Sequence, residues 1–294
     1  MGNNVVTLTD LNQEIIRREL EKRKESKIYA DNFWEYCKKS DPEFFFDDKT
    51  LLMDLANKLQ LVKEKKIRKL AVSMYPRAGK SYTISLFCSW LLGNNPDGCV
   101  MRNAYGDHLA NKFSYDVRQM INQDLFKTTF EGVRLSKQKK SLDCWALNTS
   151  KQFAYFGSGV GGTTTGFGCN LAGIVDDPIK NIADAMSTKV LDFIQDWYYS
   201  THRTRFEANL DTDFVCPEII ISTMWNKNDL LNNVLATEGT VDEGGDWHFV
   251  SYPALTEDGV STCEAMASTE NLLAIRDDCY KAGKEFIWET MYMN

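Results

Sequence analysis

The stretch LAVSMYPRAGKSYT, residues 70–83, contains an apolar run followed by Gly79, Lys80 and Ser81. A phosphate-binding loop has the consensus Gly, four residues, then Gly-Lys-Ser or Gly-Lys-Thr. The end of that consensus is present, but Met74 stands where its first glycine belongs. The stretch is therefore either a phosphate-binding loop with a variant start or a chance Gly-Lys-Ser.

The segments on either side favour the loop. KLAVSM, residues 69–74, is apolar enough for a buried strand, and residues 81–92 have the pattern of a helix that Gly93 would end. A strand, a loop and a helix N-terminus together direct backbone N–H groups at an anion. We therefore expect ATP phosphates to lie against Pro76, Arg77, Ala78, Gly79, Lys80 and Ser81.

Two of these side chains have a specific role in such a loop. Lys80 would contact the β and γ phosphates, and the Ser81 hydroxyl would bind Mg²⁺. A second apolar run, LAGIVDD at residues 171–177, ends in two carboxylates. There Asp176 would hold the magnesium and its water shell, and Asp177 would orient or deprotonate the attacking water. The alternative is a turn after a strand, because Asp and Pro are turn formers.

Strand and helix patterns alternate along the rest of the chain. This alternation predicts an α/β fold with a mostly parallel central sheet flanked by helices, of the P-loop NTPase (ASCE/RecA-like) class. We expect an N-terminal helical region at 1–49, an ATPase core at 50–255 and a C-terminal linker or small subdomain at 256–294. The expected helices are 8–27, 50–65, 107–122 and 183–200; the expected strands are 99–105, 171–177, 218–225 and 248–255, with a hairpin of 144–148 and 152–157.

Composition excludes several classes of protein. A hydrophobic fraction of 43% and a charged fraction of 26% are typical of a soluble globular protein. No stretch approaches the roughly 20 apolar residues that span a bilayer, so we expect no membrane association. The 8 cysteines never form Cys-x-x-Cys and there are only 3 histidines, which argues against a zinc site. A net charge of −7 argues against wholesale coating of a polyanion but allows local basic patches.

Taken in order, the motifs resemble the ATPase domain of the large terminase subunit of tailed bacteriophages, a motor that packages DNA into a procapsid. In that family the loop often reads Pro-Arg-x-Gly-Lys-Ser, and Gly-rich sequence precedes Asp-Asp-Pro. The resemblance runs from about Asn32 to Leu255. The stretches that carry it are residues 76–81, 103–121, 159–181, 192–206, 220–230 and 246–255.

The resemblance implies further roles. Arg77 would sense or neutralise the γ phosphate, and Ser222 and Thr223 would couple hydrolysis to movement. A transition-state arginine is commonly borrowed from a neighbouring subunit in ring ATPases, and Arg205 matches an arginine that recurs in the family, with Arg118 ranked after it. The alternative is that these arginines have no catalytic role and form structural ion pairs.

The resemblance also implies partners and a location. The implied partners are duplex DNA held through its phosphates, a portal protein and a small terminase subunit. Copies of the chain would form a homo-oligomeric ring on the portal in the host cytoplasm. In isolation the chain would be a monomer. The family continues into an RNase H-like nuclease with a carboxylate cluster, which this sequence lacks up to Asn294. Either the nuclease is truncated or it is a separate chain, so we expect no nuclease activity from this one.

Two positions depart from the family pattern. Met224 stands where Thr-Arg-Trp is common, and Phe167 stands where an arginine often precedes the acidic strand. Two other functions are therefore weighed: another P-loop nucleic-acid translocase of the helicase kind, and a non-enzymatic nucleotide-binding scaffold. A scaffold would have no need of Lys80, Ser81 and the two aspartates together.

Overall fold

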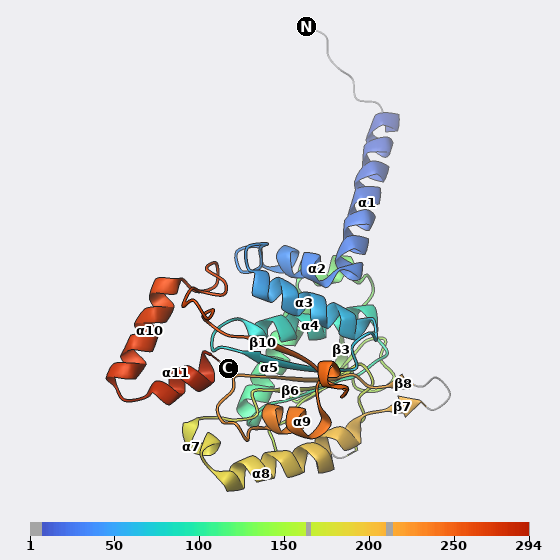
Figure 1. Ribbon diagram of the computed structural model, residues 1–294. Helices are drawn as coiled ribbons and strands as arrows, with labels where there is room; N and C mark the ends of the chain where they lie inside the picture. Colours follow the sequence, from blue (N-terminus) through green and yellow to red (C-terminus); the bar gives the residue numbers. More distant parts are fainter. Residues whose placement is uncertain (1–7, 163–165, 210–213, 294) are drawn as a thin grey trace.

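The computed structural model describes residues 8–162, 166–209 and 214–293, and its core is one large sheet between two layers of helices (Figure 1). Within these residues, eight strands form the sheet and two more form a separate hairpin, β7 (Ala208–Asn209) with β8 (Phe214–Val215). The order across the large sheet is β10 (His248–Tyr252), β1 (Lys69–Met74), β9 (Glu218–Ser222), β6 (Ala172–Asp176), β2 (Val100–Asn103), β5 (Tyr155–Phe156), β4 (Cys144–Leu147) and β3 (Leu135–Lys140).

Six of these strands, from β10 to β5, are parallel, and the hairpin β4–β3 extends the sheet with antiparallel pairs. The expected α/β fold with a mostly parallel sheet is thus confirmed. Parallel strands end at the same edge of a sheet, so β1, β9, β6 and β2 bring their last residues together there. We call this the carboxyl edge.

Alternate residues of the strands enter two different cores. Leu70 and Val72 of β1 belong to the larger core, whereas Ala71 between them faces the smaller one. The period of two follows from the pleat of a strand. The helices on the larger core's side are α2 (Phe33–Ser40), α3 (Thr50–Lys63), α4 (Lys80–Asn94), α5 (Asp107–Asn122) and α6 (Asp124–Thr129); those on the other side are α7 (Ile182–Ala185), α8 (Thr188–Trp197) and α9 (Leu230–Glu238).

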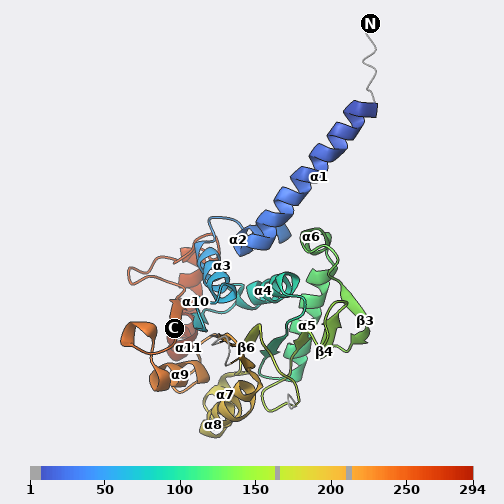
Figure 2. The same ribbon diagram turned by 90° about the vertical axis from the view of Figure 1, so that its right-hand side faces the viewer.

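The remaining helices lie at the periphery. The C-terminal end of the N-terminal helix α1 (Leu8–Asp31) adjoins the body of the protein, and the rest of this helix projects away from the body (Figure 2). Helices α10 (Thr269–Lys281) and α11 (Glu285–Met291) form a pair beside the sheet (Figure 1). Among the described residues, no helix is long and apolar enough to cross a membrane.

Several expected helix boundaries were wrong. The first helix continues past residue 27 to Asp31, and the second ends at Lys63 rather than at residue 65. We expected Gly93 to end its helix, but α4 continues to Asn94. Gly93 is instead a packing residue, because a Cβ there would lie 2.3 Å from the ring of Phe130. The single helix expected at 183–200 is broken before Ser187, whose side chain caps α8, and it ends in a π-helical turn at Tyr198–His202.

Candidate active site

The loop between β1 and α4 has the backbone that a phosphate cradle requires. Gly79 adopts φ +88° and Arg77 φ +63°, the left-handed region in which glycine is favoured. A Cβ at Gly79 would also lie 2.7 Å from the ring of Phe44. Gly79 precedes the first residue of α4 and has no side chain to cap it. The first N–H groups of α4 therefore remain available to an anion.

Lys80, the first residue of α4, has its ammonium group between two strand ends. Its side chain is 9% exposed, and Nζ lies 3.0 Å from Oδ2 of Asp177 after β6. Nζ also donates to Oγ1 of Thr223 after β9, at 2.9 Å. The Thr223 hydroxyl in turn donates to the carbonyl of Met74 at the end of β1. The carboxyl edge thus brings together three segments that are far apart in the sequence.

Ser81 and Asp176 form the second half of the site. The Ser81 hydroxyl donates to Oδ1 of Asp176 at 2.9 Å, so the two oxygens are close enough to bind the same metal ion. Asp176 is fully buried in β6. Because carboxylate and hydroxyl oxygens suit a hard cation, this pair fits Mg²⁺.

The second oxygen of Asp176 is held by a residue that the sequence reasoning missed. Arg102 of β2 is fully buried and forms an ion pair with Oδ2 of Asp176. Its guanidinium also donates to Oγ of Ser85 at 2.8 Å and to the carbonyl of Ser81 at 2.9 Å. Burial would lower the pKa of Arg102, but the Asp176 carboxylate outweighs it and the pKa is raised. The sequence feature that could have identified Arg102 is its position inside the apolar run CVMRNAY, where a charged residue needs a buried partner.

Asp177 has a constrained backbone and a perturbed carboxyl group. Its φ is +50°, and its Oδ1 accepts a hydrogen bond from the N–H of Thr223 at 3.0 Å. Its own N–H and carbonyl bond to Ile221 and Tyr105 on either side of β6. Burial raises the pKa of Asp177, while the ammonium of Lys80 opposes the shift. A non-glycine residue held in this conformation beside a phosphate loop is typical of a functional position.

The two departures from the family pattern are packed into the protein. Met224 is buried in the smaller core. Phe167 stacks on Phe156 with ring centroids 5.0 Å apart and meets Phe153 edge-on. Neither position presents a polar group to the carboxyl edge.

A second set of buried polar residues lies at the end of β2 and was also missed. Asn103, the last residue of β2, donates to Ser158 and has its amide oxygen 3.0 Å from Nδ1 of His202. Because that oxygen accepts, Nδ1 carries the proton. Burial lowers the pKa of His202 to about 3, so the ring is neutral at physiological pH. This bond ties the π-helical turn after α8 to the end of β2.

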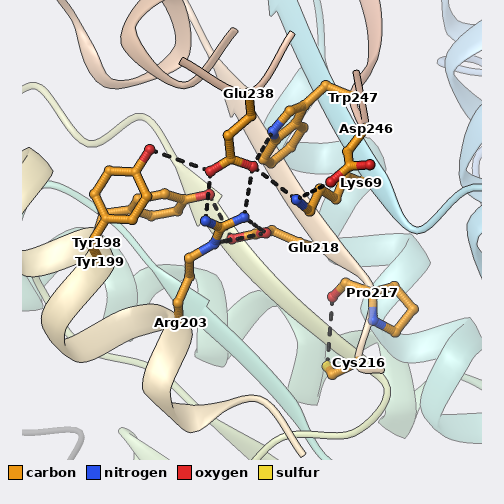
Figure 3. A network of polar contacts seen from close by, with 10 residues as sticks. All are labelled: Lys69, Tyr198, Tyr199, Arg203, Cys216, Pro217, Glu218, Glu238, Asp246 and Trp247. Carbon is orange, nitrogen blue, oxygen red and sulfur yellow. Dashed lines mark hydrogen bonds and ion pairs between the residues drawn. The ribbon is translucent and has the colours of Figure 1, made fainter. Parts of the chain in front are cut away.

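The candidates Arg118 and Arg205, and Arg203 close to the latter in sequence, differ in their surroundings. Arg203 forms two-pronged contacts with Glu218 and Glu238 in a polar network at the opposite edge of the sheet (Figure 3). It is a structural ion-pair residue. Arg118 donates to the carbonyl of Lys140.

Arg205 also lies at the opposite edge, and its guanidinium contacts only Thr204 among the described residues. Its carbonyl accepts from the N–H of Cys169, ahead of the first residue of β6. The five residues of β6 span about 17 Å. Arg205 therefore cannot reach the phosphate loop of its own chain.

No protein-family model matches this chain, and no curated protein does. A solved structure, the large terminase of bacteriophage HK97, has a similar fold with a TM-score of 0.53 at 16% sequence identity. The likeness covers 80% of this chain and 49% of that one, so this chain spans about half the length of the terminase. The resemblance that the motifs predicted is therefore confirmed at the level of the fold, which is similar to about half of a phage large terminase.

Proposed function

We propose that this chain is the ATP-hydrolysing motor of a DNA-packaging terminase and that it couples hydrolysis to translocation of duplex DNA into a procapsid. The observation that carries the proposal is the meeting of Lys80, Ser81, Asp176, Asp177 and Thr223 at the carboxyl edge. The likeness to a phage terminase in fold supports the choice of motor.

The order of the strands supports assignment to the ASCE/RecA-like class of P-loop NTPases. β9 lies between β1, which leads into the phosphate loop, and β6, which ends in the two aspartates. This insertion puts Thr223 within reach of both halves of the site. In our proposal Ser222 and Thr223 form the coupling element, because Thr223 contacts Lys80 and Asp177 simultaneously.

The residues fit ATP with Mg²⁺. Ser81 and Asp176 would hold the metal ion, which neutralises charge on the phosphates. Pro76, Arg77, Ala78 and Gly79 line the cradle, and the exposed Arg77 is free to approach the γ phosphate. Arg102 holds the buried Asp176 side chain in place through their ion pair.

Asp177 acts as the general base in this proposal. In the structure its Oδ2 is paired with Lys80. On nucleotide binding Lys80 turns to phosphate oxygens while it keeps Thr223 as its second partner. Asp177 then has an oxygen free to accept a proton from the attacking water. Its raised pKa brings it closer to the range in which a carboxylate is an effective base.

The partners follow from the same proposal. We infer duplex DNA, a portal protein, a small terminase subunit and further copies of this chain in a ring, all in the cytoplasm of a bacterial host. Another nucleic-acid translocase of the helicase kind would use the same site chemistry, and the likeness in fold favours the terminase.

Turnover of ATP with Mg²⁺, measured with and without duplex DNA, tests the proposal. Lys80→Ala is expected to abolish turnover, because the contact with the β and γ phosphates is lost. Asp177→Asn keeps the shape and removes the base, so it should bind nucleotide yet turn over at least about 100-fold more slowly. Hydrolysis at the parent rate by Lys80→Ala would overturn the assignment of the site.

A further inference from the structure

The outermost strand of the sheet carries an unusual density of cations. Residues 134–151 contain five cations and one acid, Asp143, in a chain whose net charge is −7. We call this set the β3 edge: Arg134, Lys137, Lys139, Lys140 and Lys151.

The side chains of the β3 edge face solvent. The four lysines are exposed, and Arg134 is partly buried. Among the described residues none of the five forms an ion pair, whereas Arg17, Arg18 and Arg23 on the projecting α1 all pair with glutamates. Arg118 adds a further cation, since its guanidinium donates to the carbonyl of Lys140 at 3.3 Å. The charge of this edge is therefore not compensated within the described fold.

Beside these lysines lies a hollow with aromatic walls. A cavity of about 240 Å³ is lined by Lys139, Lys151, Phe153 and Phe167 together with glycine backbone. The ammonium of Lys139 lies 5.2 Å from the centroid of the Phe153 ring and is 3.5 Å from the carbonyl of Lys151. Exposed cations beside aromatic rings suit a phosphodiester backbone, whose charged phosphates alternate with sugars.

Backbone contacts lead from the turn after β3 to the candidate active site. β3 has the same direction as the parallel strands, because it pairs antiparallel to β4, which pairs antiparallel to β5. Lys140 pairs with Trp145, and Trp145 pairs with Tyr155 opposite Val100, so β3 ends level with the start of β2. The turn after β3 then leads toward the carboxyl edge. Asp143 in the next turn accepts from the N–H of Gly157, and Gly159 pairs with Ala104 at the end of β2. Ala104 is next to Asn103, which neighbours the strand that ends in Asp176.

We propose that the β3 edge is the surface on which the chain holds the phosphate backbone of duplex DNA, independently of base sequence. The proposal rests on the motor function above and adds the place where the polymer is held. Exposed lysines on an edge strand also discourage pairing with other chains, and that is the competing explanation.

The test measures binding of a fluorescein-labelled duplex of mixed sequence to the full chain across a salt series. The variant is Lys137→Gln/Lys139→Gln/Lys140→Gln. Its matched control is Lys22→Gln/Lys24→Gln/Lys27→Gln, which removes the same charge from equally exposed lysines of α1. Each phosphate contact contributes about −0.9 to the slope of log K against log salt, so the variant's slope should be shallower by about 2 to 3. The control should keep the parent slope.

ATP turnover without DNA separates this proposal from the motor function. Both triple variants should keep the parent's basal rate, because none of these lysines lies in the site. A parent that hydrolyses ATP but does not bind the duplex overturns the DNA surface alone. A Lys137→Gln/Lys139→Gln/Lys140→Gln variant that binds the duplex with the parent's affinity and salt slope also overturns it, whether or not its solubility changes. Equally tight binding of polyglutamate would also overturn it, since the edge would then recognise an acidic protein.

Discussion

At the scale of single residues, the site places the buried Asp176 and the partly exposed Asp177 opposite two separate cations. Asp176 is paired with Arg102, and Asp177 is paired with Lys80. Removing one partner of a buried pair leaves an uncompensated charge, which typically costs about 3–5 kcal/mol. Changes at Arg102 or Asp176 would therefore mix loss of stability with loss of activity. Thr223 offers a cleaner test, because it is neutral.

Thr223→Val should slow ATP turnover while leaving the fold intact. It keeps the shape of the side chain but removes the hydroxyl that accepts from Lys80 and donates to Met74. A hydrogen bond to a charged group contributes about 1.5–3 kcal/mol, so turnover should fall about tenfold to a hundredfold. Steady-state hydrolysis and the affinity for a fluorescent ATP analogue measure the two effects separately.

Thr223→Ser is the matched control, since it keeps the hydroxyl and loses one methyl group. It should retain most of the parent's activity. Parent rates and parent affinity in the valine variant would mean that the hydroxyl has no part in holding Lys80.

At the scale of elements, the sequence predicted those whose patterns are local. The strand before Pro76, the acidic strand and the hairpin are apolar runs bounded by turns, and all three occur in the structure. β3 was missed because LSKQKK has no apolar run, and pairing with β4 rather than propensity makes it a strand. Arg102 and His202 were missed because their roles depend on which strands become neighbours, and spacing in the chain does not encode that.

The polar network around Arg203 joins several elements at the opposite edge of the sheet (Figure 3). Arg203 follows the π-helical turn and holds Glu218 at the start of β9 and Glu238 at the end of α9. Lys69 at the start of β1 binds Glu238 as well, at 2.8 Å. Trp247, next to β10, donates to the same carboxylate. Glu238 is therefore the group that ties these elements together.

This arrangement predicts how stability depends on pH. Burial alone would raise the pKa of Glu238, but hydrogen bonds from Arg203, Lys69 and Trp247 lower it from 4.5 to about 2. A carboxyl group with a lowered pKa stabilises the folded state above its unfolded pKa, and that contribution is lost as the pH falls through the folded pKa. Glu238→Gln should therefore destabilise the chain at neutral pH, and its deficit should shrink as the pH falls from 4.5 towards 2.

Urea unfolding of the parent and of Glu238→Gln at several pH values measures that deficit. Asp246→Asn is the control, because Asp246 binds the same Lys69 but its side chain is 73% exposed. It should change stability little at any pH. A deficit in Glu238→Gln that stays constant over the whole range would show that its carboxylate is not held as described.

At the scale of the whole molecule, the two edges of the sheet have different chemistry. The carboxyl edge holds the loop between β1 and α4 and both aspartates, and the opposite edge holds the Arg203 network and Arg205. Arg205 is partly exposed and forms no ion pair among the described residues. Arg205 cannot reach the site of its own chain. It can reach the site of a neighbouring copy only if the opposite edge of one subunit packs against the carboxyl edge of the next. That is a head-to-tail contact, which closes into a ring when the rotation allows.

Turnover should therefore be slow in the isolated chain and should rise with protein concentration as copies meet. An arginine supplied by a neighbour contributes about 10³–10⁵ in rate in related phosphoryl-transfer enzymes. Mixing Arg205→Ala with Lys80→Ala should restore activity where the intact loop of the first meets the intact arginine of the second. Arg205→Lys is the matched variant: it keeps the charge but loses the planar fork, so it should remain far below the parent. If the mixture stays as inactive as its components at concentrations where parent subunits demonstrably associate, Arg205 does not act in the neighbouring site.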